Sequence, residues 1–259
     1  MTTHSTPFFV ALQDRGLIHI EGEDRHAFLQ GLVSNDVLSI PSGQIRYACL
    51  LTPQGKFLHD LFIHEGDGFL LIDCEGGNRA RDLYDRLNKY RLRSKVKISV
   101  EESSPVYAVF GTAEGHPDPR HKDMGHRTFT KPDHTEKPFE AWDTHRIRLG
   151  IPDGSRDMIV ERDTLLDGNI DKLNGIDWDK GCYMGQELTA SMHYRTLGKK
   201  RLHPVKITGP APAPFTDIHL NGELIGQMRS FCGNIGLAML RDDALETLHD
   251  DKNPIRLLG

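Results

Sequence analysis

Apolar and polar residues alternate in several short runs within the first 100 residues of the chain. This alternation is typical of β-strands with one buried face, and it predicts strands at residues 16–22, 45–51, 57–64, 69–74 and 95–100. In residues 23–33 and 78–92 the apolar side chains fall instead on one helical face, and Asp24 is a candidate N-cap for the first helix. The pattern predicts a unit of mixed α and β structure.

The middle of the chain is less regular. Residues 111–140 hold four prolines and few apolar side chains, which predicts an irregular connection with one short strand. A helix is expected over residues 142–152, where Gly150 and Pro152 end it.

The last 60 residues show a third pattern. A proline-rich connector at residues 208–215 precedes short apolar runs that are separated by turn sequences, and Asn221–Gly222 is a strong hairpin signal. We therefore expect a small β-barrel domain over residues 201–259. The body would occupy residues 1–200, in two subdomains connected near residues 105–140.

Composition narrows the class of protein. The 259 residues suit one large unit plus a smaller one, and 37% hydrophobic with 27% charged residues is typical of a folded protein. We expect no membrane span, because the apolar runs are short. The N-terminus shows neither a secretion signal nor a clear transit peptide. Four cysteines without a CxxC pair favour a reducing compartment, which we expect to be the cytoplasm, or the mitochondrial matrix in a eukaryote.

The most distinctive chemistry lies in the segment KGCYMGQE, residues 180–187. Here Cys182 stands between two glycines, and helix-forming residues follow. A helix that begins there would direct its unpaired N–H groups towards Cys182, and Lys180 adds a cation. Both features favour the thiolate, which is the nucleophilic and metal-binding form of cysteine. Gln186 and Glu187 stand in the first helical turn, where they could hydrogen-bond a ligand.

Other interpretations of the cysteines stay open at this point. A single cysteine is most often a small buried hydrophobic residue, and we favour that interpretation for Cys49, Cys74 and Cys232. For Cys182 the two interpretations carry similar weight. A hydrolase with a Cys–His–Asn arrangement is a third, although the fourteen histidines offer no obvious partner.

Two basic segments, residues 86–97 and 194–203, could bind phosphates, nucleic acid or a polyglutamate tail. They could equally be solvated faces at helix ends, which we favour for the first segment. The second segment follows the cysteine motif, which favours a function. The net charge of −5 argues against bulk nucleic-acid binding. Asp60 lies on an apolar strand face, where it is either paired structurally or poised to bind a ligand. No metal site is expected.

The KGCYMGQE segment resembles the signature of the YgfZ family of folate-binding proteins. This family includes mitochondrial iron–sulfur assembly factors of the Iba/Caf type and is related to the T-protein, the aminomethyltransferase of glycine cleavage. Further blocks agree in the same order, so the resemblance covers about residues 10–245. They are FLQGLVSNDV, LLTPQGKFLHDLFI, YRLRSKVKI, DPR, LGIPDG and GNIGLAMLR.

The resemblance implies an α+β fold with a T-protein-like folate-binding body and a C-terminal β-barrel around a central opening. It implies tetrahydrofolate or a related folate as ligand, with Cys182 as the functional cysteine and Lys180, Gln186 and Glu187 beside it. A pterin pairs well with a carboxylate, for which Asp60 and Glu187 are candidates. The glutamate tail of folate pairs with arginine, for which Arg146 and Arg148 are candidates.

Three functions follow from these observations. The first is a folate-dependent factor that assembles or repairs iron–sulfur proteins, mainly those with [4Fe–4S] clusters, with an indirect effect on tRNA modification. Its partners would be assembly proteins or client enzymes, because one cysteine cannot hold a cluster alone. The second is a folate-dependent aminomethyltransferase. The third is a tRNA-binding module that uses residues 194–203.

Overall fold

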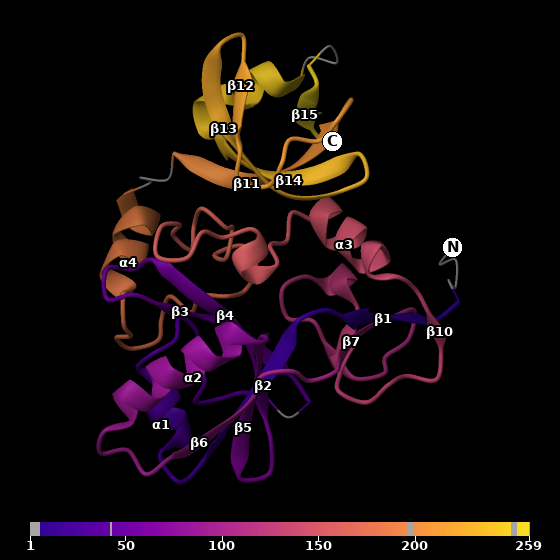
Figure 1. Ribbon diagram of the computed structural model, residues 1–259. Coiled ribbons are helices and arrows are strands. Elements are labelled where there is room, and N and C mark those ends of the chain that lie inside the picture. Colours follow the sequence, from indigo (N-terminus) through magenta and orange to yellow (C-terminus); the bar gives the residue numbers. More distant parts are fainter. Residues whose placement is uncertain (1–5, 42, 196–198, 250–252, 259) are drawn as a thin grey trace.

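The computed structural model describes residues 6–41, 43–195, 199–249 and 253–258. These residues form three five-stranded sheets with short helices packed between and around them (Figure 1). The C-terminal sheet lies at one end of the molecule, and the two sheets of the body lie side by side at the other. Among the described residues, no helix is long and apolar enough to cross a bilayer.

The larger body sheet has the strand order β3-β4-β5-β2-β6 and is antiparallel throughout. Helices α1 and α2 pack against it over a core of aliphatic side chains. All five strands and both helices agree with the sequence patterns, but Asp24 does not cap α1 with its side chain; its Oδ2 accepts from the backbone N–H of Lys95 instead. The elements are β2 (Arg15–Glu21), α1 (Arg25–Gln30), β3 (Ile45–Leu51), β4 (Phe57–Glu65), β5 (Phe69–Glu75), α2 (Asn78–Arg91) and β6 (Lys97–Glu101).

The second body sheet has the order β10-β1-β7-β9-β8. The connection at 111–140 contributes three short strands to it, where the sequence predicted one, because two-residue and three-residue strands leave no readable alternation. Helix α3 follows and begins three residues earlier than predicted. The elements are β1 (Phe8–Leu12), β7 (Val106–Phe110), β8 (His116–Pro117), η1 (Lys122–Met124), β9 (His126–Thr128), β10 (Thr135–Glu136), α3 (Phe139–Arg148) and η2 (Gly154–Arg156).

The C-terminal sheet has the order β12-β13-β14-β11-β15 and starts at Lys200. Its first hairpin turns at Asn221 and Gly222, both with positive φ, as the Asn–Gly signal predicts. Helix α4 (Gln186–Arg195) precedes the sheet, and residues 149–185 run between body and barrel mostly as turns. The elements are β11 (Lys200–Ile207), β12 (Asp217–Leu220), β13 (Glu223–Cys232), β14 (Ile235–Arg241), η3 (Asp242–His249) and β15 (Ile255–Leu257).

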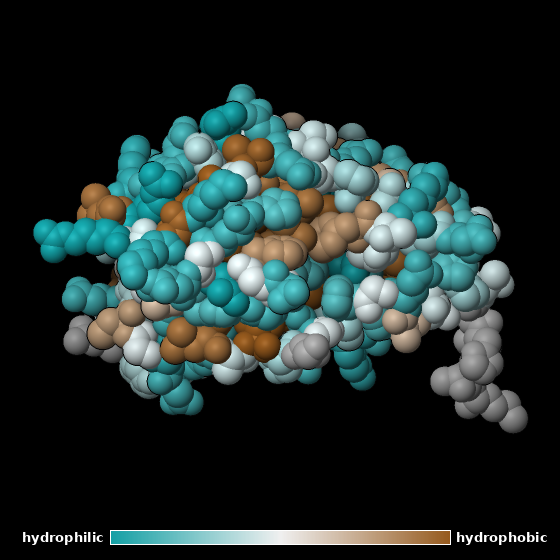
Figure 2. Space-filling model, turned by 90° about the horizontal axis from the view of Figure 1, so that it is seen from below, coloured by the Kyte–Doolittle hydropathy of each residue, from teal (hydrophilic) through white to brown (hydrophobic). Residues whose placement is uncertain are grey.

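One hydrophobic core joins the parts. It runs from Val10 in β1 through Tyr47 in β3 to Leu237 in β14, so the barrel is seated on both body sheets. Viewed from the body end, hydrophilic side chains cover most of the surface, with hydrophobic ones between them (Figure 2). Leu38 and Leu92 are among the exposed large hydrophobic residues, which occur singly along the chain, as is usual for a folded protein.

Candidate functional site

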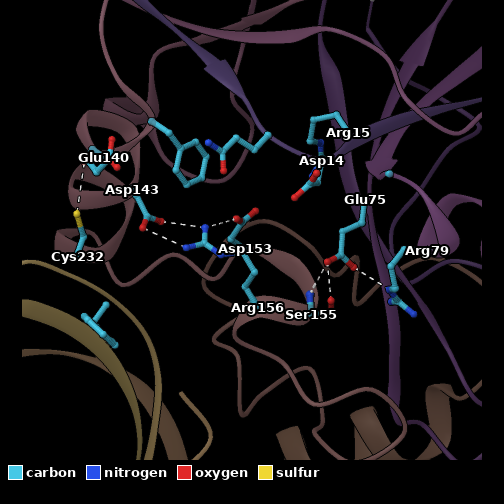
Figure 3. A pocket seen from close by; sticks show the side chains of 14 residues that line it. Asp14, Arg15, Glu75, Arg79, Glu140, Asp143, Asp153, Ser155, Arg156 and Cys232 are labelled. Carbon is cyan, nitrogen blue, oxygen red and sulfur yellow. Dashed lines mark hydrogen bonds and ion pairs between the residues drawn. The ribbon is translucent and has the colours of Figure 1, made fainter. Parts of the chain in front are cut away.

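A hollow of about 550 Å³ opens where the two body sheets and the barrel meet (Figure 3). We call it the central hollow. Its volume falls within the range of about 300–1,000 Å³ that is usual for small-molecule sites. The larger body sheet and α2 supply Asp14, Arg15, Glu75 and Arg79; α3 and the following turn supply Phe139, Glu140, Asp143, Asp153, Ser155 and Arg156; and β13 supplies Phe231 and Cys232.

Glu75 anchors one side of the central hollow. Its Oε1 accepts hydrogen bonds from the backbone N–H of Ser155 at 2.9 Å and from the Ser155 hydroxyl at 2.7 Å, and its Oε2 accepts from Arg79 Nε at 3.0 Å. The turn can approach this closely because residue 154 is glycine. A Cβ there would lie 2.7 Å from Cδ of Glu75, and its φ is +49°. The β5 end and the turn after α3 are therefore held together across the hollow.

Arg156 organises the opposite side. Its Nη1 lies 2.7 Å from Asp153 Oδ2 and 3.1 Å from Asp143 Oδ1, and its guanidinium carbon lies 5.3 Å from the centre of the Phe139 ring. By contrast, the carboxylates of Asp14 and Glu140 make no hydrogen bond or ion pair with any residue that the structure describes. The central hollow thus offers a half-buried aromatic ring and two unpaired carboxylates to a ligand.

A buried ionic network supports the floor of the central hollow. Arg15 Nε donates to Asp73 Oδ1 at 2.7 Å, and Arg127 pairs with the other oxygen of Asp73. Burial alone would raise the pKa of Asp73, but Arg127 and Arg15 hold it below its ordinary value. These guanidiniums also lie over the Phe62 ring, which fixes Arg15 at the wall of the hollow.

Asp60, a predicted folate contact, lies behind this wall and does not line the central hollow. Its side chain is buried, its Oδ2 lies 3.4 Å from the Tyr47 hydroxyl, and its Oδ1 has no hydrogen-bond partner in the described structure. Burial, and then the nearby charge of Glu75, raise the pKa of Asp60 to about 6.

Arg146 and Arg148, the predicted tail contacts, do not line the hollow either. Arg146 is fully buried and binds Asp143, Asp157 and, through Nη2, the Ser230 hydroxyl at 2.6 Å. It also donates to the carbonyl of Ile151. Its donors are used in joining α3 to the barrel. Arg148 is exposed at the end of α3.

The Cys182 motif lies away from the residues that line the central hollow. Cys182 is an exposed free thiol in the coil that precedes α4. Gly185 has a φ of +81°, and a Cβ there would lie 2.5 Å from the carbonyl oxygen of Thr52, so the motif is seated on the β3–β4 turn. The glycine therefore serves a close approach between two backbones.

Lys180 faces the protein rather than a ligand. Its Nζ donates to the carbonyl oxygens of Gln30, Val33 and Asn35 at 2.9, 2.7 and 2.6 Å. All three N–H donors of an ammonium are thereby used. Burial lowers the pKa of Lys180 to about 8. Lys180 does not line the central hollow, and it holds the loop after α1 against the motif.

The other two motif residues differ. Gln186 accepts a hydrogen bond through Oε1 from the Tyr183 N–H at 3.3 Å, so it stabilises the start of α4. Glu187 is exposed. Near the end of α4, the His193 ring stacks on Trp178 with centroids 3.9 Å apart, and Tyr194 is 72% exposed. These rings form an aromatic group on α4 and the coil before it.

Sequence reasoning missed the lining of the central hollow. Its residues are far apart along the chain, and most of them stand beside a turn glycine or at an element end, as Glu75 does before Gly76–Gly77. A charged residue next to a glycine was the sequence signal that could have pointed to these positions.

Of the basic segment 194–203, residues 196–198 lie outside the described residues. Lys199 is exposed and Lys200 pairs with Asp163 at 3.3 Å.

Comparisons with known proteins agree with this architecture. A family model described as the C-terminal beta-barrel domain of CAF17 matches residues 199–257. The crystal structure of the glycine cleavage system aminomethyltransferase T from Bartonella henselae superimposes with a TM-score of 0.71 over 93% of this chain and 80% of that chain, at 15% identity. This likeness shows the fold, and it confirms the predicted T-protein-like body with a C-terminal barrel.

Sequence relatives show the family. The mitochondrial iron–sulfur cluster assembly factor IBA57 of Mus musculus is 30% identical, with 91% of this chain and 78% of the relative covered. The human IBA57 is 31% identical over the same shares of the two chains. The homologue of Pyricularia oryzae is 29% identical, covering 94% and 74%. At this identity and coverage, on this fold, the chain belongs to the family of the IBA57 iron–sulfur cluster assembly factors.

Proposed function

We propose that this protein assembles or repairs iron–sulfur proteins, mainly those with [4Fe–4S] clusters, through the exposed thiol of Cys182 and a folate bound in the central hollow. The observation that carries the proposal is the pairing of an exposed free cysteine with a separate small-molecule hollow in a chain of the IBA57 family. The relatives are named as mitochondrial, so we place the protein in the mitochondrial matrix or in the cytoplasm of a bacterium.

Cys182 is the residue that handles the cargo. Thiolate sulfur is a soft ligand that suits iron and iron–sulfur clusters. One cysteine supplies one ligand, whereas a [4Fe–4S] cluster needs four. A partner protein would therefore provide the remaining ligands. An exposed thiol in a coil can reach such a partner without unfolding of its own chain, and the neighbouring rings of Trp178 and Tyr194 would add contact area.

The central hollow suits the chemistry of a folate. The Phe139 ring offers a face on which a pterin can stack, and the unpaired carboxylates of Asp14 and Glu140 can accept the adjacent N–H groups of the pterin. Arg79 can pair with the glutamate carboxylate of the folate. Bound tetrahydrofolate would supply a carrier for one-carbon units. The hollow and Cys182 share no residue, so folate binding and thiol chemistry are separable.

The first test is an anaerobic calorimetric titration of tetrahydrofolate. We expect Phe139→Ala, and the double variant Asp14→Asn with Glu140→Gln, to lose most of the affinity. The double variant Asp133→Asn with Glu136→Gln, which changes exposed carboxylates outside the hollow, should bind like the wild type. Equal affinity in all of these proteins would contradict the proposal that folate binds in the central hollow.

The second test separates the thiol from the ligand. Cys182→Ser should fold and bind tetrahydrofolate normally, yet fail to support [4Fe–4S] enzymes in cells that lack the native protein. Asp179→Asn is the control, because it changes an exposed side chain in the same coil and outside the central hollow, and it should support these enzymes. Full support by Cys182→Ser would contradict the role of this thiol, whatever the folate result.

Two other activities remain as alternatives. An aminomethyltransferase would turn over an aminomethyl donor with free tetrahydrofolate, and the T-protein-like fold is compatible with this. A tRNA-binding module would show a salt-sensitive affinity for tRNA that falls in the double variant Lys199→Ala with Lys200→Ala. Lys200 already pairs with Asp163, whereas the charge of Lys199 has no partner among the residues that the structure describes.

A further inference from the structure

Arg229 on β13 is a buried guanidinium with unused donors. Its side chain is 1% exposed. Nη2 donates to Asp163 Oδ2 at 3.0 Å, whereas Nε and Nη1 have no partner among the residues that the structure describes. Buried polar groups are almost always hydrogen-bonded, because an unmade bond in the interior is costly. The free N–H groups of Arg229 therefore call for an acceptor that the described part of the chain does not supply.

Asp163 cannot meet this need alone. Its Oδ2 also accepts the backbone N–H of Ile159 at 2.8 Å, and its Oδ1 accepts from Lys200 Nζ at 3.3 Å. One carboxylate is thus shared between two cations. Burial lowers the pKa of Arg229 from its ordinary value, although the nearby carboxylates of Asp163, Asp157 and Asp167 act in the opposite direction.

A second hollow, of about 320 Å³, lies beside Arg229 between the body and the barrel. The turn around Ile159–Asp163 forms its body side, and β11, β13 and β14 form its barrel side. It shares no lining residue with the central hollow. A ligand here would touch both parts of the molecule at once.

The lining of the second hollow holds more cations than carboxylates. Its cations are Arg162, Lys200, Arg229 and Arg241, and Arg241 is neutralised by Asp243 at 2.9 Å. Two carboxylates, Asp163 and Asp217, face the remaining three cations. The side chain of Arg162 is exposed and makes no hydrogen bond or ion pair with the described residues. Asp167, which is outside the lining, lies 3.9 Å from Lys200 Nζ and adds a counter-charge, so the unused donors of Arg229 rather than a net charge mark this hollow.

Phe215 adds a separate observation. It has a φ of +64°, a conformation unfavourable for a bulky side chain, and its backbone N–H donates to the Met228 carbonyl at 2.8 Å. This places its 41% exposed ring 5.3 Å from the guanidinium carbon of Arg229. The proline-rich connector thus covers one face of the guanidinium and leaves its edges for in-plane hydrogen bonds.

We propose that the second hollow binds an oxyanion, the carboxylate or phosphate group of a small molecule. Arg229 would donate hydrogen bonds to the anion from its unused N–H groups. Arg162 and Lys200 would add positive charge that attracts the anion. Because the lining comes from body and barrel, the bound anion ties the barrel to the body. The site is independent of the proposed folate site and of Cys182.

The test uses inorganic phosphate and glutarate as probes, each against sodium chloride at equal ionic strength. Binding is followed by calorimetry and by the midpoint of thermal unfolding, which a ligand of the native state raises in a saturable way. We expect saturable binding of at least one probe. The probe that binds more tightly shows whether the site prefers a phosphate or a carboxylate group. Arg229→Gln should abolish binding, and Arg162→Gln should weaken it about threefold, as befits an exposed charge. Arg93→Gln, which removes an exposed arginine elsewhere, should change nothing.

Three results would overturn the proposal. One is a response to both probes that rises linearly without saturating, because excluded salts stabilise any folded protein in that way. Another is equal affinity in wild type, Arg162→Gln and Lys200→Gln. The third is unchanged affinity in a folded Arg229→Gln. If Arg229→Gln does not fold, the Arg162 and Lys200 variants decide the question, because both side chains are at least partly exposed.

Discussion

Gly55 and Gly185 pack backbone against backbone, and this contact seats the Cys182 motif on the larger body sheet. A Cβ on Gly55 would lie 2.8 Å from the carbonyl oxygen of Gly185, and a Cβ on Gly185 would lie 3.0 Å from Cα of Gly55. Both residues have φ between +70° and +85°. No other residue type satisfies these two conditions without strain.

Gly185→Ala should therefore destabilise the protein, by about 2 kcal/mol or more, because the methyl group clashes with rigid backbone and the left-handed φ disfavours alanine. Urea unfolding monitored by tryptophan fluorescence measures the loss. Gly181→Ala is the matched control, since a Cβ there meets nothing within 4 Å, and its stability should be near that of the wild type. Equal stability of the two variants would argue against the close approach at Gly185.

Lys180→Met should cost about 2–4 kcal/mol of stability at pH 7, because three carbonyl oxygens lose their charged donor. Hydrogen exchange should show the loss first in the loop of residues 31–36. Lys172→Met, at an exposed lysine, provides the comparison and should leave both the stability and the exchange unchanged. Normal protection of the loop in Lys180→Met would mean that those three bonds contribute little.

Asp60→Asn should stabilise the protein at pH 8 and have little effect at pH 4. The folded-state pKa of Asp60 is about 6, above the ordinary 3.8, so the folded state binds the proton more tightly than the unfolded state does. The stability that this proton contributes is fully present below pH 3.8 and is lost as the pH rises through 6. This rise in pKa corresponds to at most about 3 kcal/mol, and unfolding curves of both proteins would show a difference in stability that grows from pH 4 to pH 8.

The four cysteines should react with iodoacetamide in an order set by burial. Cys182 is exposed and should be modified first, with Cys232 second. Cys49 and Cys74 are fully buried, and burial raises the pKa of Cys74 to about 12 and that of Cys49 well above its ordinary value, so both should react only on unfolding. Peptide mass spectrometry over time gives the order. Early labelling of Cys49 would contradict the burial of this residue in the core around β3.

Local patterns predicted most of the fold correctly. The strands of the larger body sheet, its two helices and the Asn221–Gly222 hairpin all follow from alternation, helical spacing and turn chemistry, which are properties of neighbouring residues. The short strands β8 to β10 do not follow from local patterns, because pairing across the second sheet, rather than their own sequence, makes them strands. The site depended still more on distant contacts.

The sequence alone determined the family, the α+β architecture and the singular position of Cys182, because these are encoded in contiguous motifs. The tertiary structure decided what the charged residues do. Lys180 and Arg146 turned to backbone carbonyls and buried carboxylates, whereas Glu75, Arg156 and Arg229 came to line hollows. The reason is physical: a buried charge must find partners, and which partners lie within 3 Å is settled only when segments far apart in the chain pack together.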